Sequence, residues 1–260
     1  MSTLPTKRDE AWRYSDLAAL ERVWPVPVPD KIIVVAGDSQ RLSLVQDAPD
    51  DAVVVRDFTI EVGVGASFAM QLVNTGGQLG RVALDVTLHE GASFDLQAAM
   101  IGGGSQTVEL VTVVRHFEAN ATSRQTVRSI AGGKATLSYI GKVAVSRDAQ
   151  KTDAAQSVKA MLLDRTATAN AKPELEIYAD DVKCAHGATV GELDAQALFY
   201  LASRGLPPAE AKALLLRAFV SGLFDGSPDE AEFTAAIDAA LGRLLVPLPL
   251  AGGARGGAES

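Results

Sequence analysis

The sequence predicts a mainly β protein in which strands stack into a solenoid and a helical segment follows. From 31 to about 190, apolar and polar residues alternate, and this period of two buries one face of each strand; the clearest run is Val82, Leu84, Val86 and Leu88. The tetrapeptide Gly-Ala-Ser-Phe occurs at 65–68 and again at 91–94, as expected for a repeated corner in stacked coils. Helical periodicity is nearly absent before Gly191, which argues against βαβ architecture. A β-sandwich is the alternative, and the repeated corner favours the solenoid.

Residues 1–30 form a lead-in to this β body. The segment 9–20 is expected to form a short helix that carries Trp12. Alternating prolines at 25, 27 and 29 follow it. Because proline lacks an N–H donor and has a fixed φ, this stretch is expected to be extended and linker-like. The β body is then expected to occupy residues 31–193.

After the β body, apolar residues recur every three or four positions instead of every two. Residues 194–250 are therefore expected to form a helical domain with three helices. Asp194 caps the first helix, and Pro208 opens the second. Residues 227–230 have the pattern of a capping box ahead of the third helix, whose apolar stripe is Phe233, Ile237, Leu241 and Leu244. The glycine-rich residues 251–260 are expected to be a disordered tail.

The charge balance argues against a protein that coats nucleic acid. The 260-residue chain has 24 Lys and Arg against 32 Asp and Glu, a formal net charge of -8, whereas phosphate binding needs clustered cations. No apolar run approaches the roughly 18–20 residues of a membrane span, and the N-terminus lacks the apolar stretch of a secretory signal. A single cysteine excludes an internal disulfide and fits a reducing compartment. The sequence therefore predicts a cytoplasmic protein with no nucleic-acid or membrane partner.

One cysteine and one histidine stand two residues apart in the strand-like segment 178–189. On a strand, Cys184 and His186 project from the same face, with their Cα atoms about 6–7 Å apart. A thiolate beside an imidazole suits a soft or borderline transition metal. From spacing alone, a small buried cysteine and a packed histidine are the commoner outcome. As metal ligands the two groups would fill only half of a site with about four ligands, so the remainder must come from elsewhere.

The other residues that could perform chemistry are isolated. His89 and His116 each stand near an acidic residue and are expected to be exposed rim residues rather than ligands. The glycines at 102–104 lack the Gly-Lys-Ser/Thr that a phosphate loop requires, so a turn is expected. Neither G-x-S-x-G nor H-E-x-x-H occurs, and the hydrolase and metalloprotease templates find no support. The sequence predicts a protein without catalytic residues.

Long ordered runs resemble the SufD family, whose members are scaffold subunits of the SUF iron–sulfur cluster assembly machinery and relatives of SufB. The resemblance covers essentially the whole chain and is densest from about 140 to 205. It rests on an N-terminal tryptophan signature and on a series of later runs: Arg8–Leu17, Gly141–Val143, Ala149–Ala154, Gln156, Lys172–Cys184, His186–Asp194, Ala197–Leu201 and Ser203–Gly205. Because SufB is larger and richer in cysteine, a chain with one cysteine resembles SufD more closely.

The resemblance implies a fold, partners and a site. Family members have a right-handed parallel β-helix followed by a C-terminal helical domain, in agreement with the residue pattern. They pair with SufB through the last part of the β-helix, and their C-terminal helices dock the SufC ATPase. The family histidine that matches His186 is implicated in handling iron or the cluster at the SufB–SufD interface, and Cys184 matches the adjacent cysteine. Both are therefore expected ligands of iron or an iron–sulfur cluster that is transient and shared with SufB, and the isolated chain is expected to bind neither.

Two departures from the family pattern are visible. Family members carry a helical domain of several tens of residues before the tryptophan motif, whereas about seven residues precede it here, so a short form is expected. Ala185 stands where the family commonly has serine. It projects from the strand face opposite Cys184 and His186, so the change should matter little to a metal.

The predicted function is a non-catalytic scaffold that pairs with SufB and docks SufC. Three alternatives stay open: a β-helix enzyme acting on polysaccharide, a thiol hydrolase built on Cys184 and His186, and a homodimeric structural β-helix protein. The aromatic content of 5% offers few platforms for sugars, and no group that would orient a catalytic thiol is evident. A homodimer is the natural alternative when SufB is missing, because open β-helix edges invite symmetric pairing.

Overall fold

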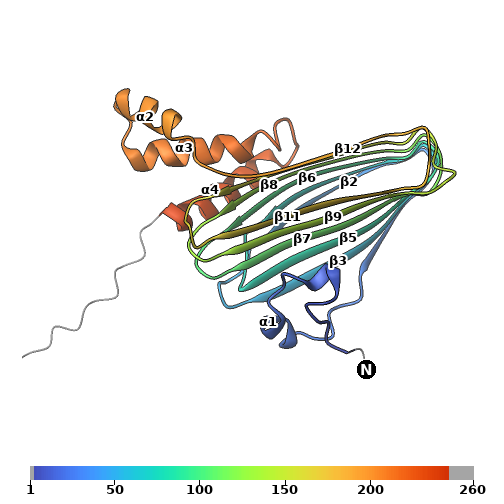
Figure 1. Cartoon of the computed structure of the whole chain (residues 1–260), viewed down its shortest axis with the longest axis horizontal. Helices are drawn as coiled ribbons and strands as arrows, with labels where there is room; N and C mark the ends of the chain where they lie inside the picture. The colour runs from blue at the N-terminus through green and yellow to red at the C-terminus, as the bar shows by residue number, and fades with distance from the viewer. Residues whose placement is uncertain (1–2, 246–260) are drawn as a thin grey trace, which may run out of the picture.

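The structure is a computed structural model that describes residues 3–245, and it contains a parallel β-solenoid with helices against one face (Figure 1). The predicted tail at 251–260 lies outside the described residues, as do the last residues of the predicted helical domain. In the described part of the chain, the strands of the solenoid are β1 (Asp30–Val34), β2 (Ser39–Gln46), β3 (Val53–Val62), β4 (Ser67–Asn74), β5 (Leu79–Leu88), β6 (Ser93–Gly102), β7 (Thr107–His116), β8 (Thr122–Ala131), β9 (Thr136–Val145), β10 (Asp153–Leu162), β11 (Thr168–Ile177) and β12 (Lys183–Glu192).

Odd-numbered and even-numbered strands form two separate six-stranded sheets, called here the odd sheet and the even sheet. Neighbouring strands in each sheet are parallel, and their order follows the chain from β1 to β11 and from β2 to β12. Every two strands therefore complete one coil, and the chain makes about six coils. The predicted solenoid is confirmed, and the sandwich alternative is wrong.

The main core lies between the two sheets, where alternate residues of each strand face inwards. The two Gly-Ala-Ser-Phe corners stack directly in register, and the rings of Phe68 and Phe94 lie parallel with centroids 6.2 Å apart. Gly65 and Gly91 have φ values of +62° and +63°, a conformation that L side chains rarely adopt. Glycine is favoured at these two corners, which explains the repeat seen in the sequence, whereas Asn120 and Lys151 adopt the same positive φ in later coils.

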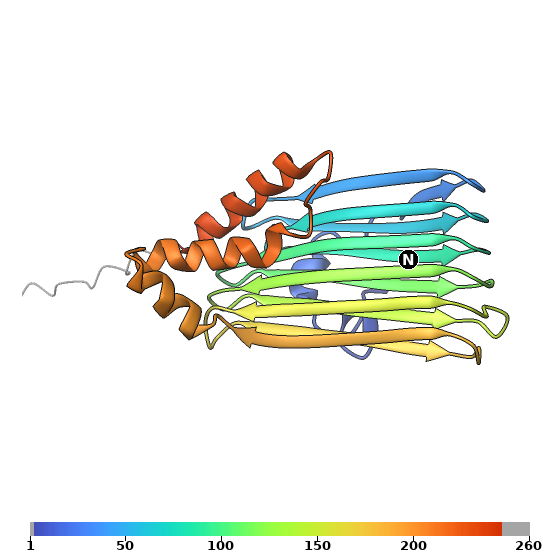
Figure 2. The ribbon, with the colours of Figure 1, turned by 90° about the horizontal axis from the view of Figure 1, so that it is seen from above.

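Three helices follow the solenoid in the described residues, and the last two of them cover part of the outer face of the even sheet (Figure 2). They are α2 (Ala195–Ser203), α3 (Pro208–Ser221) and α4 (Glu230–Leu245). A second core joins outward residues of β4, β6 and β8 to the apolar stripes of α3 and α4; among its members are Val73, Ile101, Ile130, Val220, Phe233 and Ile237. The predicted capping box takes another form, because Ser227 accepts from Asp229 N–H while Glu230 accepts from Gly226 N–H. No helix within residues 3–245 combines the length and the apolar character needed to cross a membrane.

The N-terminal lead-in packs against the outer face of the odd sheet, on the side opposite α3 and α4 (Figure 1). The single helix predicted for 9–20 is instead a 3₁₀ turn, η1 (Glu10–Trp12), and a short helix, α1 (Leu17–Glu21). Ser15 and Asp16 explain the break. The Ser15 hydroxyl donates to Glu109 in the sheet, and Asp16 accepts from Ala19 N–H as the N-cap of α1.

Candidate functional site: the open coil of the solenoid

The last coil of the solenoid, formed by β11 and β12, has a neighbouring coil on one side only, and we call it the open coil. Figure 2 shows β12 at the edge of the even sheet. Lys183 N–H donates to the carbonyl of Thr152, the residue just before β10. In a parallel pair, alternate residues turn their N–H and C=O groups to opposite sides. The even-numbered residues of β12 therefore direct their backbone donors and acceptors to the free edge. Within residues 3–245, no strand pairs with that edge.

Cys184 and His186 both lie on the inner face of β12. Cys184 is in register with Ala154 of β10, and His186 is in register with Gln156. Ala154 and Gln156 are buried between the sheets, whereas Cys184 is half-buried and His186 is exposed. The difference arises because a further coil covers β10 and none covers β12. The sequence-predicted pair thus shares one strand face, at the uncovered end of the solenoid interior.

The surroundings of Cys184 favour the protonated thiol. Partial burial is the main reason that its pKa is raised, the Asp153 carboxylate adds to the rise, and the backbone of Ala154 opposes it. Cys184 packs beside the small apolar cluster of Val143, Val145, Ala149, Ala154 and Ala179. A thiol with a raised pKa is a poor nucleophile, so the local chemistry does not favour a thiol hydrolase. A bound metal cation would favour loss of this proton.

The donor set of the open coil suits a metal only in part. Thiolate and imidazole both bind soft and borderline transition metals, iron included. Among residues 3–245, no three His, Cys, Asp or Glu side chains gather as a metal site. Cys184 and His186 thus fit iron or a cluster as cargo only if the remaining ligands come from outside the described chain.

A buried polar column inside the solenoid leads to the open coil. It consists of Thr112, Gln125, Tyr139 and Gln156, each at most 3% exposed in an interior that is otherwise mainly apolar. The Tyr139 ring folds over Gly141, where a Cβ atom would lie 2.1 Å from the hydroxyl oxygen, so only glycine leaves room for it. Burial raises the pKa of Tyr139 to about 12, and the hydroxyl stays protonated.

This column was not predicted from the sequence. A visible signal exists, because polar residues at 125 and 156 occupy the inward phase of alternating strands. Reading it requires the register between coils, which the sequence alone does not supply.

The prediction that His116 is an exposed rim residue is wrong. The same prediction for His89 is close to what the structure shows, because His89 is partly exposed. His116 closes β7 with its ring turned inwards and is fully buried, with Nε2 2.8 Å from the Ser123 hydroxyl. His116 is in register with Val145, which faces the core, so its side chain points inwards although its neighbours in the sequence are polar. His89 is partly exposed at the edge of the solenoid, with its two nitrogens 3.3 Å from Glu61 and 3.4 Å from Glu118. Neither histidine lies at the open coil.

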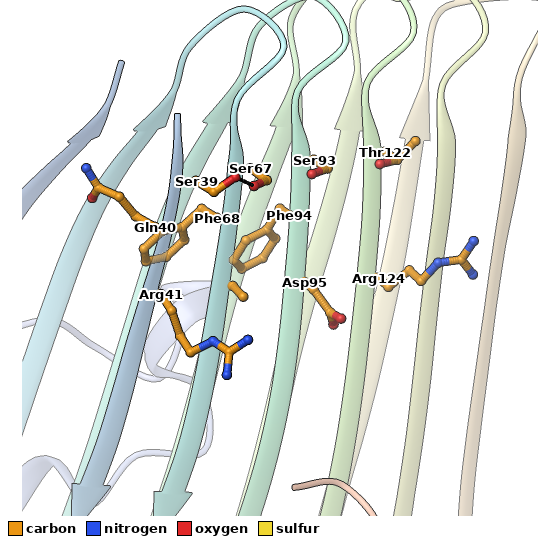
Figure 3. Close-up of a pocket in the computed structure, with 11 residues that line it drawn as sticks. Ser39, Gln40, Arg41, Ser67, Phe68, Ser93, Phe94, Asp95, Thr122 and Arg124 are labelled. Carbon is orange, nitrogen blue, oxygen red and sulfur yellow. Dashed lines mark hydrogen bonds between the residues drawn. The ribbon is translucent and has the colours of Figure 1, made fainter. Parts of the chain in front are cut away.

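A polar groove on the outer face of the even sheet is the other notable surface (Figure 3). Hydroxyl side chains lie in register across four strands there, at Ser39, Ser67, Ser93 and Thr122. Charged side chains project beside them, at Arg41, Asp95 and Arg124. The groove crosses β2, β4, β6 and β8, so it is separate from Cys184 and His186 on the inner face of β12.

Helix α2 has an exposed aromatic face. None of its residues is buried. Phe199 and Tyr200 are 76% and 56% exposed, and the Arg204 guanidinium lies 5.2 Å from the centre of the Tyr200 ring. Adjacent exposed aromatic side chains beside an arginine are typical of protein interaction surfaces.

These features define a class: a β-solenoid whose uncovered last coil carries potential metal ligands, with helices attached to an outer face. Comparison with known proteins names the family. The model described as "SUF system FeS cluster assembly, SufBD core domain" matches residues 31–219. The chain therefore belongs to the SufBD family of the SUF system for iron–sulfur cluster assembly.

Curated relatives agree with this assignment. An iron–sulfur cluster assembly SufBD family protein of Synechocystis sp. is 32% identical over 195 residues, which are 74% of this chain and 43% of that protein. The iron–sulfur cluster assembly protein SufD of Escherichia coli is 39% identical over 119 residues, 46% of this chain and 28% of that protein. SufD of Bacillus subtilis is 28% identical over 163 residues, 63% of this chain and 37% of that protein. The chain thus spans less than half the length of these relatives.

Proposed function

We propose that the protein is a non-catalytic scaffold subunit that pairs with SufB and docks the SufC ATPase during iron–sulfur cluster assembly. In this proposal, residues 1–30 pack against the solenoid and stabilise it, residues 31–193 form the solenoid whose last coil pairs with SufB, and residues 194–250 bind SufC. The observation that carries it is the open coil, where a free strand edge occurs together with a thiol and an imidazole on one strand face. The reducing cytoplasm is the compartment in which a lone thiol of this kind would operate.

The free edges of β11 and β12 support pairing with SufB. An uncovered edge presents a row of unpaired N–H and C=O groups, and a matching strand from another chain would satisfy them. Continuing the stack in this way would place the partner's side chains opposite Cys184 and His186. The partner would then complete the ligand set for iron or a cluster, held transiently and handed on.

The exposed face of α2 supports docking of SufC. Phe199 and Tyr200 would supply apolar contact area, and Arg204 would supply a charge-assisted hydrogen bond. Because α2 follows β12 after two residues, movement of a docked ATPase would be transmitted directly to the open coil. That coupling would open the interface that holds Cys184 and His186.

The homodimer is the alternative that the open coil also favours, because the free edge of one copy could pair with that of another. The polysaccharide enzyme has less support. The groove on the even sheet exposes hydroxyl, arginine and one aspartate side chain, but a sugar site needs paired carboxylates and aromatic platforms.

Co-expression tests the proposal. The tagged chain is expressed with SufB and SufC, and the purified material is analysed by size-exclusion chromatography and mass spectrometry. We expect one complex that contains all three chains. A chain that elutes alone or only with itself, in the presence of both partners, contradicts the proposal.

A further inference from the structure

The hydrogen bonds of the buried polar column fix the orientation of the Gln156 amide. Thr112 Oγ1 and the Tyr139 hydroxyl both donate to Gln125 Oε1, at 2.7 Å and 3.1 Å. A phenolic hydroxyl has a single proton, so Tyr139 can only accept from Gln156, whose Nε2 lies 2.9 Å away. The Gln156 amide therefore presents its nitrogen to Tyr139 and leaves Oε1 as an available acceptor.

Gln156 Oε1 has no hydrogen-bond partner in the described structure, although Gln156 is only 3% exposed. A buried acceptor without a donor is costly and is uncommon in proteins. The residue in register with Gln156 on the open coil is His186, and both face inwards. Their Cα atoms are about 4.8 Å apart, the spacing of paired strands. His186 Nε2 and Gln156 Oε1 are each three bonds from Cβ, so the two side chains reach the same depth.

We propose that Gln156 is a positioning residue for His186. When the imidazole turns inwards to bind a metal at the open coil, one ring N–H donates to Gln156 Oε1, and the other ring nitrogen keeps its lone pair for the metal. A second hydrogen bond of this kind sets the tautomer and direction of metal-binding histidines in general. Tyr139 holds the amide in the required orientation. The inference rests on the proposed role of His186 as a ligand.

The test uses the full chain, Zn²⁺ as a diamagnetic probe and ¹⁵N NMR of the histidine rings. All proteins carry His89→Gln, because His89 lies between Glu61 and Glu118 and could compete for zinc. In this reference protein, Zn²⁺ should shift the His186 nitrogens and produce an imidazole N–H resonance that is protected from exchange with water. Gln156→Met removes the acceptor at similar volume. It should abolish the protected resonance and weaken Zn²⁺ binding about 10-fold or more.

Three further variants separate positioning from packing. Gln156→Glu keeps an acceptor and should retain both the protected resonance and the affinity. Tyr139→Phe leaves Gln156 in place but frees its amide, so the protected resonance should weaken even if Gln156→Met fails to fold. Val158→Ala disturbs the same inner face of β10 without touching the amide, and both readouts should persist.

The two possible failures are distinguishable. A protected His186 N–H that survives in Gln156→Met or is unchanged in Tyr139→Phe overturns the positioning role. His186 resonances that Zn²⁺ leaves unmoved in the reference protein, both alone and in complex with SufB, overturn the ligand role proposed above, whatever the Gln156 variants do.

Discussion

Arg81 and Glu109 form an ion pair of 2.9 Å beneath the N-terminal lead-in, with each side chain only 2% exposed. The Arg81 guanidinium lies 3.7 Å from the centre of the Trp12 ring and donates to the Ala11 carbonyl at 2.8 Å. The Ser15 hydroxyl donates to the same Glu109 oxygen at 2.6 Å. The tryptophan signature near the N-terminus is therefore an anchor that fixes the lead-in to the odd sheet.

Breaking this anchor on one side should destabilise the protein strongly. Glu109→Gln removes the carboxylate that pairs with the buried Arg81 charge, and breaking a buried ion pair on one side costs about 3–5 kcal/mol. The double variant Arg81→Met, Glu109→Leu removes both charges and should recover most of that stability. Chemical denaturation measures the free energy of unfolding. Asp238→Asn, which breaks the exposed pair with Arg217, is the control, and an equal effect from both single changes would contradict the anchor.

The buried His116 should make stability depend on pH. Burial lowers its pKa to about 4 from 6.5, so the unfolded chain binds this proton at a higher pH than the folded protein. Stability is then complete above about pH 6.5 and falls as the pH drops from there towards 4, by about 3 kcal/mol. The free energy of unfolding, measured at pH 7 and at pH 4.5, should fall less between the two pH values in His116→Gln than in the wild type. His89→Gln serves as the control and should keep the full dependence.

The free edge of β12 should be required for pairing with SufB. The backbone N–H of Val190 is directed to that edge, because even-numbered residues of β12 do not bond to β10. Val190→Pro removes this donor, whereas Val190→Ala keeps it and shortens the side chain. We expect pull-down of SufB to fall at least 10-fold for the proline variant and little for alanine. Equal pull-down by both variants would rule out strand pairing at this edge.

The aromatic face of α2 should be required for docking of SufC. Because Phe199 and Tyr200 are mostly exposed, Phe199→Ser with Tyr200→Ser should leave the melting temperature within a few degrees. The same change should weaken SufC binding by about 2 kcal/mol or more, the effect typical of central interface aromatics. Calorimetric titration measures it. Phe117→Ser alters an exposed aromatic beside His89, and this control should bind normally.

The sequence predicted the solenoid because its signal is local and repeated. Alternation marks each strand, and glycine with a positive φ marks corners such as Gly65 and Gly91. It also predicted that Cys184 and His186 share a strand face, because residues two positions apart on any strand project from the same face. Their position on an uncovered coil depends on how many coils follow, which only the assembled structure reveals.

Other features could not be predicted because long-range register decides them. His116 looks polar in its local sequence, yet its place at the end of an inward row buries it. The lead-in helix breaks at Ser15 because that hydroxyl bonds to a residue 94 positions away. Tyr139 and Gln156 come together only because two strands of one coil face each other across the core.

The central claim is that Cys184 and His186 supply part of a ligand set that another chain completes. Iron content per complex, measured after anaerobic co-expression with SufB and SufC, tests it most directly. We expect His186→Ala to leave the three-chain complex intact and to lower its iron content several-fold. Ala185→Ser, on the opposite face of the same strand, should change neither quantity. An intact His186→Ala complex that retains the full iron content would contradict the account.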